Sequence, residues 1–211
     1  MKRLWDISPP LRPGSPVFPG DTAFALTWSA TLSADCPVNV STLTLSPHTG
    51  AHADAPLHYS ADGVAVGALD LAPFLGPCRV IHAIDCGPLI EWAHLAHAMG
   101  HALADLPPRL LVRTCVRAPE QWTPQFSAFA PATVARLAQA GVVLIGIDTA
   151  SIDPADSKAL PSHQQIRQHG LRVLENLVLD EVAEGDYELI ALPFKLMTAD
   201  ASPVRAVLRE L

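Results

Sequence analysis

Residues 131–147 have the sequence PATVARLAQAGVVLIGI, in which a helix pattern is followed directly by a strand pattern. Residues 131–140 predict a helix, and Gly141 stands where a helix commonly ends. Residues 142–147 form an unbroken apolar run, which is typical of a strand that is buried on both faces. Residues 109–115 predict another strand upstream. These three segments are therefore expected to form a strand–helix–strand unit, most simply a right-handed parallel crossover.

The remaining segments predict more strands than helices. Strands are expected at residues 23–32, 38–45, 78–84, 187–192 and 204–208. A helix is expected at residues 91–104. Another helix is expected to begin at Ser162, which forms a capping-box signature with Gln165, and Gly170 is placed to end it. The proline- and glycine-rich segment before residue 40 is expected to wrap the domain as a loop.

The composition agrees with one folded domain and excludes several kinds of partner. The chain has 211 residues, 49% of them apolar, so we expect a single domain over residues 1–211. Its fold class is expected to be α/β, with a mixed β-sheet or barrel core and a few covering helices. The net charge of −7 argues against nucleic-acid and membrane partners. No signal sequence, membrane span or Cys-x-x-Cys pair is found, so free thiols and a cytoplasmic location are expected.

Residues 46–59, SPHTGAHADAPLHY, concentrate residue types that bind metals. The candidates occupy alternate positions: His48, His52, Asp54 and His58. In an extended chain they would share one face, but a straight strand would separate His48 from Asp54 by about 20 Å at roughly 3.3 Å per residue. Gly50 and Pro56 would let the chain curl around one ion. Two imidazoles and a carboxylate suit zinc, iron or manganese.

Two other interpretations of the histidines stay open. The residues in this segment could be separate polar loop groups, each with its own hydrogen-bond partner. A second set, His94, His97 and His101, would lie on one face of the helix expected at residues 91–104. That stripe is surrounded by alanines, which favours a solvated or dimer-facing surface over a metal site. Asp148, Asp153 and Asp156 follow the buried strand, where turn and capping roles are favoured.

The pattern His-x-Gly-x-His-x-Asp-x-Pro-x-His over residues 48–58 resembles the signature of the metal-dependent cyclase-like hydrolases. The flanking segments resemble the bacterial kynurenine formamidase (arylformamidase) branch of that family, and they lie at residues 16–21, 146–158, 187–193 and 202–205. Together they cover most of the chain, with residues 87–135 the least similar part. The resemblance implies a cyclase-like fold of the swivelling β/β/α type.

The resemblance also implies a ligand set for two divalent metal ions, most commonly zinc. It places His48, His52 and Asp54 on the first ion. It places Asp54 and His163 on the second ion, with Glu175 between the two. One continuous helix would hold His163 and Glu175 about 18 Å apart at 1.5 Å per residue, so a chain break near Gly170 is needed to bring them together.

For the reaction, the resemblance implies hydrolysis of N-formyl-L-kynurenine to L-kynurenine and formate, in a homodimer. It makes His58 the proton-transfer residue and places Phe18 in the substrate pocket, where the family commonly has Trp. At the position after Gly50 the family more commonly has Thr, whereas this chain has Ala51.

The low charged fraction, 17%, agrees with a surface that is partly covered in an oligomer. Alternatives are a cyclic-amide hydrolase of the isatin type and a metal-binding protein without turnover. The serine-hydrolase elbow and nucleotide-binding motifs are absent from the sequence.

Overall fold

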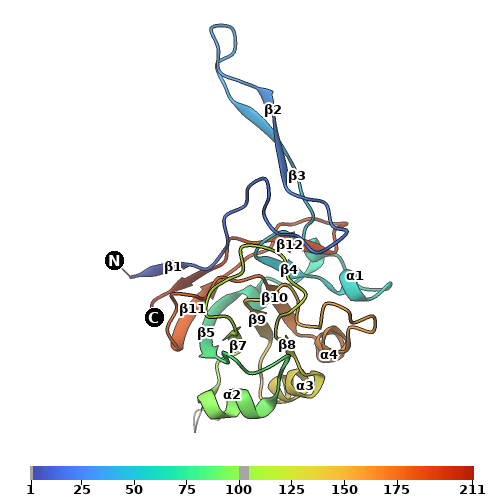
Figure 1. Ribbon diagram of the computed structural model, residues 1–211, viewed down its shortest axis with the longest axis vertical. Helices are drawn as coiled ribbons and strands as arrows, with labels where there is room; N and C mark the ends of the chain where they lie inside the picture. The colour runs from blue at the N-terminus through green and yellow to red at the C-terminus, as the bar shows by residue number, and fades with distance from the viewer. Residues whose placement is uncertain (1, 100–104) are drawn as a thin grey trace.

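Nine strands form one curled, half-barrel sheet in the computed structural model, which describes residues 2–99 and 105–211 (Figure 1). These strands are β1 (Leu4–Asp6), β4 (His52–Asp54), β5 (Leu75–His82), β7 (Arg109–Arg113), β9 (Leu144–Ile147), β10 (Arg172–Glu175), β11 (Gly185–Ile190), β12 (Ala201–Pro203) and β13 (Val207–Arg209). Their order across the sheet is β1-β13-β11-β5-β7-β9-β10-β4-β12. The central strands β5, β7, β9 and β10 are parallel, and the strands on both sides of them pair antiparallel.

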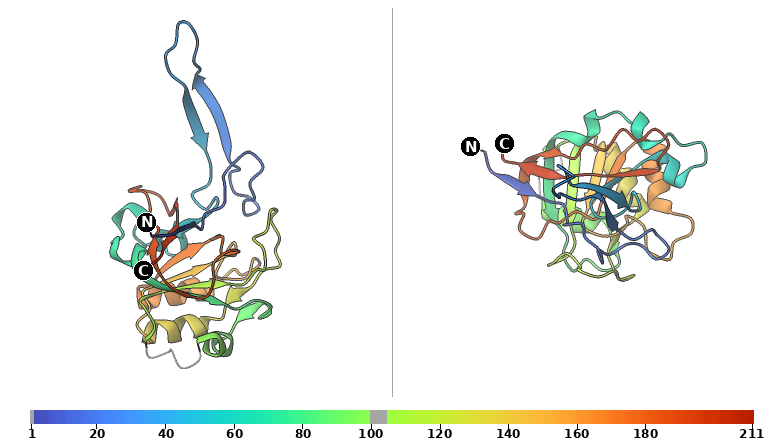
Figure 2. Two further views of the ribbon diagram at one scale, coloured as in Figure 1. Left: turned by 90° about the vertical axis from the view of Figure 1, so that its left-hand side faces the viewer. Right: turned by 90° about the horizontal axis from the view of Figure 1, so that it is seen from above.

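Three helices cover one face of the sheet: α2 (Trp92–Met99), α3 (Pro131–Gln139) and α4 (Pro161–His169) (Figures 1 and 2). Side chains alternate across a strand, so Leu110 and Val112 of β7 pack under the helices while Leu111 packs on the other face. Burying each such side chain contributes about 1.5–3 kcal/mol. The uninterrupted apolar runs in the sequence therefore follow from burial on both faces.

The other face is covered by turns and short segments. The short helical segments there are the 3₁₀ turns η1 (Val66–Ala68) and η2 (Ala72–Phe74). The short helix α1 (Pro56–Tyr59) lies beside α4 instead, and its Tyr59 packs against the core under the helices. A separate small sheet pairs β6 (Leu89–Ile90) with β8 (Ala128–Phe129) in parallel, and its Ile90 and Phe129 pack into the core on the helix side. Phe74 and Ile7 are fully buried in the core on the face away from the helices. All four cysteines are free thiols, as expected from their spacing.

The mixed α/β fold class and the parallel crossover are confirmed. Strand β7 leads through α3 into β9, and β7 and β9 pair in parallel. The N-terminal prediction is wrong at one place, because residues 4–6 form the edge strand β1 against β13 rather than part of a wrapping loop. A strand of three residues is too short to show a period of two in the sequence.

A long hairpin projects away from the rest of the molecule (Figures 1 and 2). It pairs β2 (Ala25–Ala30) with β3 (Val40–Thr44) antiparallel, as the sequence predicted at residues 23–32 and 38–45. Leu26 lies opposite Leu43 in the register, and Trp28 follows two residues later on the same face. These side chains are 38%, 56% and 58% exposed, so one face of the hairpin is apolar and uncovered by the described residues.

Candidate metal centre

Strand pairing brings the predicted ligands of the 46–59 segment next to Glu175. Strand β4 lies between β10 and β12, and its His52 is directly opposite Glu175 of β10. Opposed residues in neighbouring strands point to the same face, and Asp54, two residues after His52, points there too. Three of the six residues predicted to bind metal or transfer protons are thus aligned by backbone geometry alone.

The prediction of one extended segment from His48 to His58 is only partly right. The strand is limited to residues 52–54, His48 lies in the turn before it, and Pro56 begins helix α1, which carries His58. Proline is favoured in the first turn of a helix because its missing N–H would have no partner there. The bends do fall at Gly50, with φ +68°, and at Pro56, as expected.

His163 enters the cluster from the first turn of α4. The capping-box prediction is wrong, because Ser162 lies inside the helix and donates its hydroxyl to the Phe129 carbonyl. The cap is Asp153, whose carboxylate accepts the backbone N–H groups of Ser162 and His163 at 2.9 and 3.0 Å. Asp153 also contacts the His163 ring at Nδ1, 2.8 Å away, and this contact directs Nε2 toward the cluster. The predicted break holds, since α4 ends at Gly170 before β10 begins.

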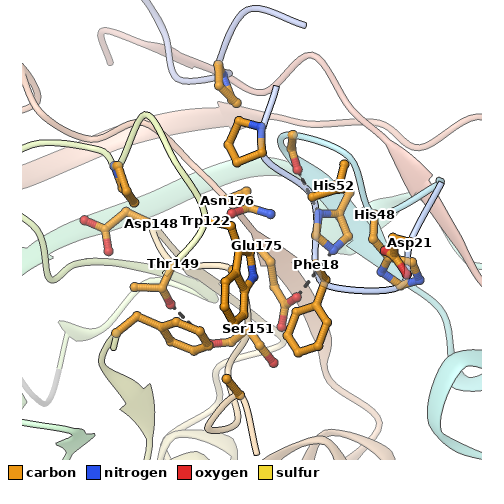
Figure 3. Close-up of a pocket in the computed structure, with 18 of the residues that line it drawn as sticks. Phe18, Asp21, His48, His52, Trp122, Asp148, Thr149, Ser151, Glu175 and Asn176 are labelled. Carbon is orange, nitrogen blue, oxygen red and sulfur yellow. Dashed lines mark hydrogen bonds and ion pairs between the residues drawn. The ribbon is translucent and has the colours of Figure 1, made fainter. Parts of the chain in front are cut away.

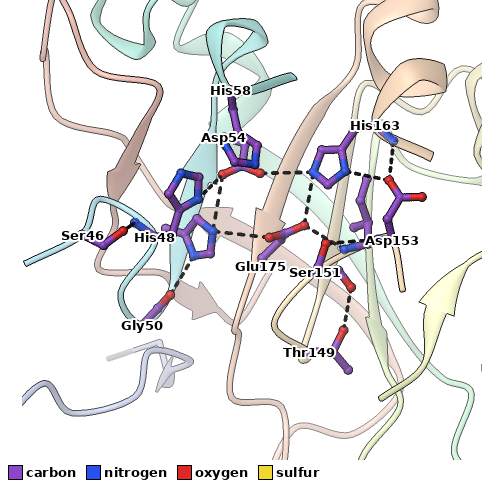
Figure 4. Close-up of polar contacts among 12 residues, drawn as sticks. Ser46, His48, Gly50, Asp54, His58, Thr149, Ser151, Asp153, His163 and Glu175 are labelled. Atoms are coloured by element: carbon purple, nitrogen blue, oxygen red, sulfur yellow. Dashed lines mark hydrogen bonds and ion pairs between the residues drawn. The ribbon is translucent and has the colours of Figure 1, made fainter. Parts of the chain in front are cut away.

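Asp54 is at the centre of the cluster (Figure 4). Its Oδ1 lies 3.1 Å from His48 Nδ1 and 3.4 Å from His52 Nε2, and its Oδ2 lies 3.2 Å from His163 Nε2. Glu175 spans the gap between two of these histidines, 3.4 Å from His52 Nε2 and 3.5 Å from His163 Nε2. All five predicted metal ligands are therefore brought together.

His58 lies at the exposed rim of the cluster, beside an acid that the sequence analysis missed. The Oδ2 of Asp200 is 3.0 Å from His48 Nε2 and 3.4 Å from His58 Nδ1, so this carboxylate links the two imidazoles. The rings of His48 and His58 are 4.3 Å apart between centroids. Asp200 directly precedes β12, the strand that pairs with β4, and its place just before residues 202–205 was the sole signal in the sequence.

The charges in the cluster compensate one another. Burial by itself lowers the pKa of His52, but the close carboxylates of Asp54 and Glu175 outweigh it and raise the pKa to about 10. Burial also opposes the charge on His163, yet Asp153, Asp54 and Glu175 raise its pKa well above the usual value. Burial favours neutral acids, but the surrounding imidazoles lower the pKa of both Asp54 and Glu175. The same carboxylates that favour protonated imidazoles would favour a divalent cation, whose binding would release those protons.

The donor atoms fit a divalent cation. Within the described part of the chain, His52 Nε2 and Asp54 Oδ1 are buried with no properly aligned hydrogen bond, although they lie 3.4 Å apart. Ligands about 2.0–2.1 Å from a tetrahedrally coordinated ion are separated by about 3.4 Å, which matches the spacing here. Three overlapping groups of three or more potential ligands occur among the described residues, and all of them use His48, His58 or both. Imidazole and carboxylate donors suit zinc and similar divalent ions.

The second histidine set does not form such a group in the part of the chain that is described. His94 lies in α2 and accepts the Glu91 backbone N–H at Nδ1, 3.0 Å away, and His97 is exposed. His101 lies outside the described residues. A capping contact is thus the visible role of His94, which agrees with the preference for a surface stripe.

The histidine–carboxylate cluster opens into a cavity of about 570 Å³ (Figure 3). Its far side is lined with aromatic and apolar side chains, including Phe18 and Trp122. Phe18 begins a turn with Pro19 and Gly20, closed by a 3.0 Å hydrogen bond from the Asp21 N–H to the Phe18 carbonyl. Gly20 has φ +99°, the conformation that a type II turn requires at this position. Asp21 accepts a hydrogen bond from Ser46, which ties Phe18 to the turn that carries His48.

Comparison with known proteins places the chain in a family. A family model described as "Putative cyclase" matches residues 5–154. A protein named kynurenine formamidase from Delftia acidovorans is 70% identical over 210 residues, covering 100% of this chain and 99% of that one. One from Bordetella pertussis is 67% identical over 212 residues, covering both chains completely. A solved structure titled as a potential metal-dependent hydrolase with cyclase activity has a TM-score of 0.84, at 25% identity and with 100% and 99% coverage.

The curled mixed sheet and its buried histidine–carboxylate cluster define a metal-dependent hydrolase of the cyclase type. The chain belongs to the putative cyclase family and, within it, to the kynurenine formamidases. An isatin hydrolase structure has a TM-score of 0.81 but only 19% identity, so that likeness extends to the fold alone. No helix among the described residues is long and apolar enough to cross a membrane.

Proposed function

We propose that the chain hydrolyses N-formyl-L-kynurenine to L-kynurenine and formate. The observation that carries this proposal is a buried His/Asp/Glu cluster that opens into a cavity with an aromatic wall, in a chain 70% identical to a named kynurenine formamidase. The cluster suits cleavage of an amide, and the aromatic wall suits the aryl ring of the substrate. The isatin-type alternative is less favoured because those relatives are much more distant.

The five clustered side chains would hold two divalent ions, for which we propose zinc. His48, His52 and Asp54 would bind one ion, Asp54 and His163 the other, with Glu175 between them. Support comes from the two oxygens of Asp54, which face different histidines, and from Glu175, which reaches His52 and His163. When bound, such ions make water a nucleophile at neutral pH and polarise a carbonyl group.

His58 would transfer the proton to the aryl amine that leaves. Its side chain lines the cavity and is partly exposed, so it can exchange protons with solvent. Asp200, 3.4 Å from its Nδ1, would hold the ring in orientation, as a carboxylate commonly does for a catalytic imidazole. Phe18 would bind the aryl ring across the cavity. Asp153 would keep His163 turned toward the cluster.

The direct test combines metal analysis with activity. The purified protein is expected to contain divalent metal and to hydrolyse N-formyl-L-kynurenine, with isatin a poor substrate. A chelator should remove both metal and activity, and zinc should restore them, because water activation depends on the ion. Metal content is measured by mass spectrometry and product by absorbance. Metal without turnover of N-formyl-L-kynurenine would favour a binding protein, and preferred turnover of isatin would favour the cyclic-amide alternative.

We also propose a homodimer in which the apolar face of the β2–β3 hairpin packs against a second copy. An isolated two-stranded hairpin is marginally stable in water, and this one extends beyond the body of the molecule (Figure 2). Its exposed face carries Leu26, Trp28 and Leu43. The neighbouring Thr27 points to the opposite, more polar face, where Ser29 and Thr42 share a 2.8 Å hydrogen bond.

Light scattering should give a mass twice the 22.5 kDa of one chain. Trp28→Lys, which places a charge on the apolar face, is expected to shift the protein toward monomer. Thr27→Lys is the matched control one residue away and should stay dimeric. A wild-type monomer, or a Trp28→Lys protein that remains dimeric, would contradict the proposed interface.

A further inference from the structure

Asn176 directly follows the cluster residue Glu175 and has a backbone conformation that few residues adopt. Its φ is +55°, in the left-handed region, where asparagine is one of the few side chains found besides glycine. Its N–H donates to the Thr149 carbonyl at 2.8 Å, and the next N–H, of Leu177, donates to the Ile147 carbonyl at 3.1 Å. A left-handed residue held in place by its surroundings is typical of functional sites.

This conformation makes Asn176 an extra residue at the end of strand β10. Within the strand, Leu174 packs in the core on the face away from the helices, and Glu175 points to the cluster. An uninterrupted strand would return Asn176 to the face of Leu174. Leu177 takes that place instead, because it packs in the same core as Leu174 and both leucines lie against Gly146. The side chain of Asn176 lines the cavity, in the way that an extra residue beside an active site often redirects a side chain.

The side-chain amide of Asn176 is accessible and has no partner within the described part of the chain. The residue is half-buried and forms part of the same cavity wall as Glu175 (Figure 3). Neither its Nδ2 nor its Oδ1 makes a hydrogen bond to another described residue, and the buried side-chain atoms that lack a partner all belong to other residues. Solvent therefore reaches this amide, which can offer two N–H donors and one carbonyl acceptor to a bound molecule.

We propose that the side-chain N–H of Asn176 donates a hydrogen bond to the formyl oxygen of the substrate. This inference rests on the proposed function, in which the formyl group occupies the histidine–carboxylate cluster. Because Asn176 directly follows Glu175, its amide lies where the cluster meets the cavity. As water adds to the formyl carbon, an electron pair of the C=O bond moves to the formyl oxygen, and a fixed donor stabilises the negative charge that develops there. The carboxylate of the substrate has better partners in Arg117 and Lys158, charged side chains that also line the cavity.

The test is Asn176→Gly, which removes the amide and keeps a residue that adopts the left-handed conformation freely. It is expected to lower kcat about 10²-fold, the loss typical of removing one donor to a developing oxyanion, and to leave KM within about 2-fold. Formanilide has the formamide but neither the ketone nor the amino-acid group, so its kcat should fall as much as that of N-formyl-L-kynurenine. Metal content, measured by mass spectrometry, should equal that of the wild type. Asn176→Asp serves if the glycine variant does not fold, and it should lose at least as much kcat because it lacks the N–H donors.

The matched control is Asp85→Gly, which makes the same kind of change at an exposed residue with φ +58° that does not line the cavity. It should leave kcat and KM unchanged on both substrates.

Four results for the Asn176 variants would overturn the proposal while the function stands. A higher KM at unchanged kcat would limit the amide to binding the substrate before reaction. A loss confined to N-formyl-L-kynurenine would assign the amide to another group of that substrate. Loss of metal would make Asn176 a residue that positions Glu175, and an unchanged kcat and KM would show that the amide is unused. If the wild type does not accept formanilide, kcat and KM on N-formyl-L-kynurenine decide, whereas a wild type inactive on both overturns the function as well.

Discussion

Replacing Asp54 with alanine is expected to leave the protein without its metal ions and to lower kcat/KM by more than about 10³-fold. The reason is the central place of this carboxylate. Its Oδ1 faces His48 and His52, and its Oδ2 faces His163, so one substitution removes a donor from both proposed ion positions. Metal content by mass spectrometry and the rate on N-formyl-L-kynurenine measure the two effects separately.

Two further variants make the result interpretable. Asp35→Ala removes an exposed aspartate in the hairpin loop and should keep full metal content and activity. Asp54→Asn keeps the side-chain shape and one carbonyl oxygen, and it serves if the alanine variant does not fold. The metal affinity of Asp54→Asn should still fall by at least about 100-fold. Removing a group that only orients a metal ligand already lowers metal affinity by about 10- to 100-fold. Full metal occupancy in a folded Asp54→Ala protein would overturn the ligand assignment.

His58→Ala is expected to keep the metal and to lower kcat by about 10²–10⁴-fold, the usual contribution of a group that transfers a proton. His58 is close enough to Asp54 and His163 to belong to a group of potential ligands, so retained metal is the decisive readout. The loss of kcat should be smaller with 4-nitroformanilide than with N-formyl-L-kynurenine. The 4-nitroaniline that leaves is a weak base and depends less on protonation by an acid. Rates on both substrates and metal content are measured on the same preparation.

The control for His58 is His97→Ala, which removes an exposed histidine of α2 and should change neither metal content nor rate. Circular dichroism establishes that each variant is folded. Loss of metal on replacing His58 would make it a ligand instead of a proton-transfer residue. An equal loss of kcat on N-formyl-L-kynurenine and on 4-nitroformanilide would contradict proton transfer to the leaving group.

Much of the fold could be predicted from the sequence, because strands buried on both faces have continuous apolar runs. Residues 142–147 predicted β9 in this way, and the preceding helix and strand predicted its parallel partner β7. The short edge strand β1 could not be found, since three residues show no period. Helix α1 was also missed, because Pro56 was interpreted as a bend in an extended chain when it begins a helix turn.

The candidate site was predictable where its residues are close in sequence. The spacing of His48, His52 and Asp54 predicted a local metal-binding group. Glu175 and His163 entered through a resemblance, because their place depends on pairing between β4 and β10 and on packing of α4, which no local pattern shows. Asp200 was missed for the same reason, since its contact with His58 follows from the pairing of β12 with β4.

The position of β4 in the sheet also affects when the proposed metal site can be completed. Its two neighbours, β10 and β12, come from the last 40 residues of the chain, so a growing polypeptide has His48, His52 and Asp54 long before it has Glu175. A chain that ends before His163 would therefore present three of the five proposed ligands. Ions bound at the proposed site would bind most tightly once this part of the sheet is complete, and they would then stabilise the finished molecule over every incomplete one. Metal capture would in this sense be a check on the completeness of the chain.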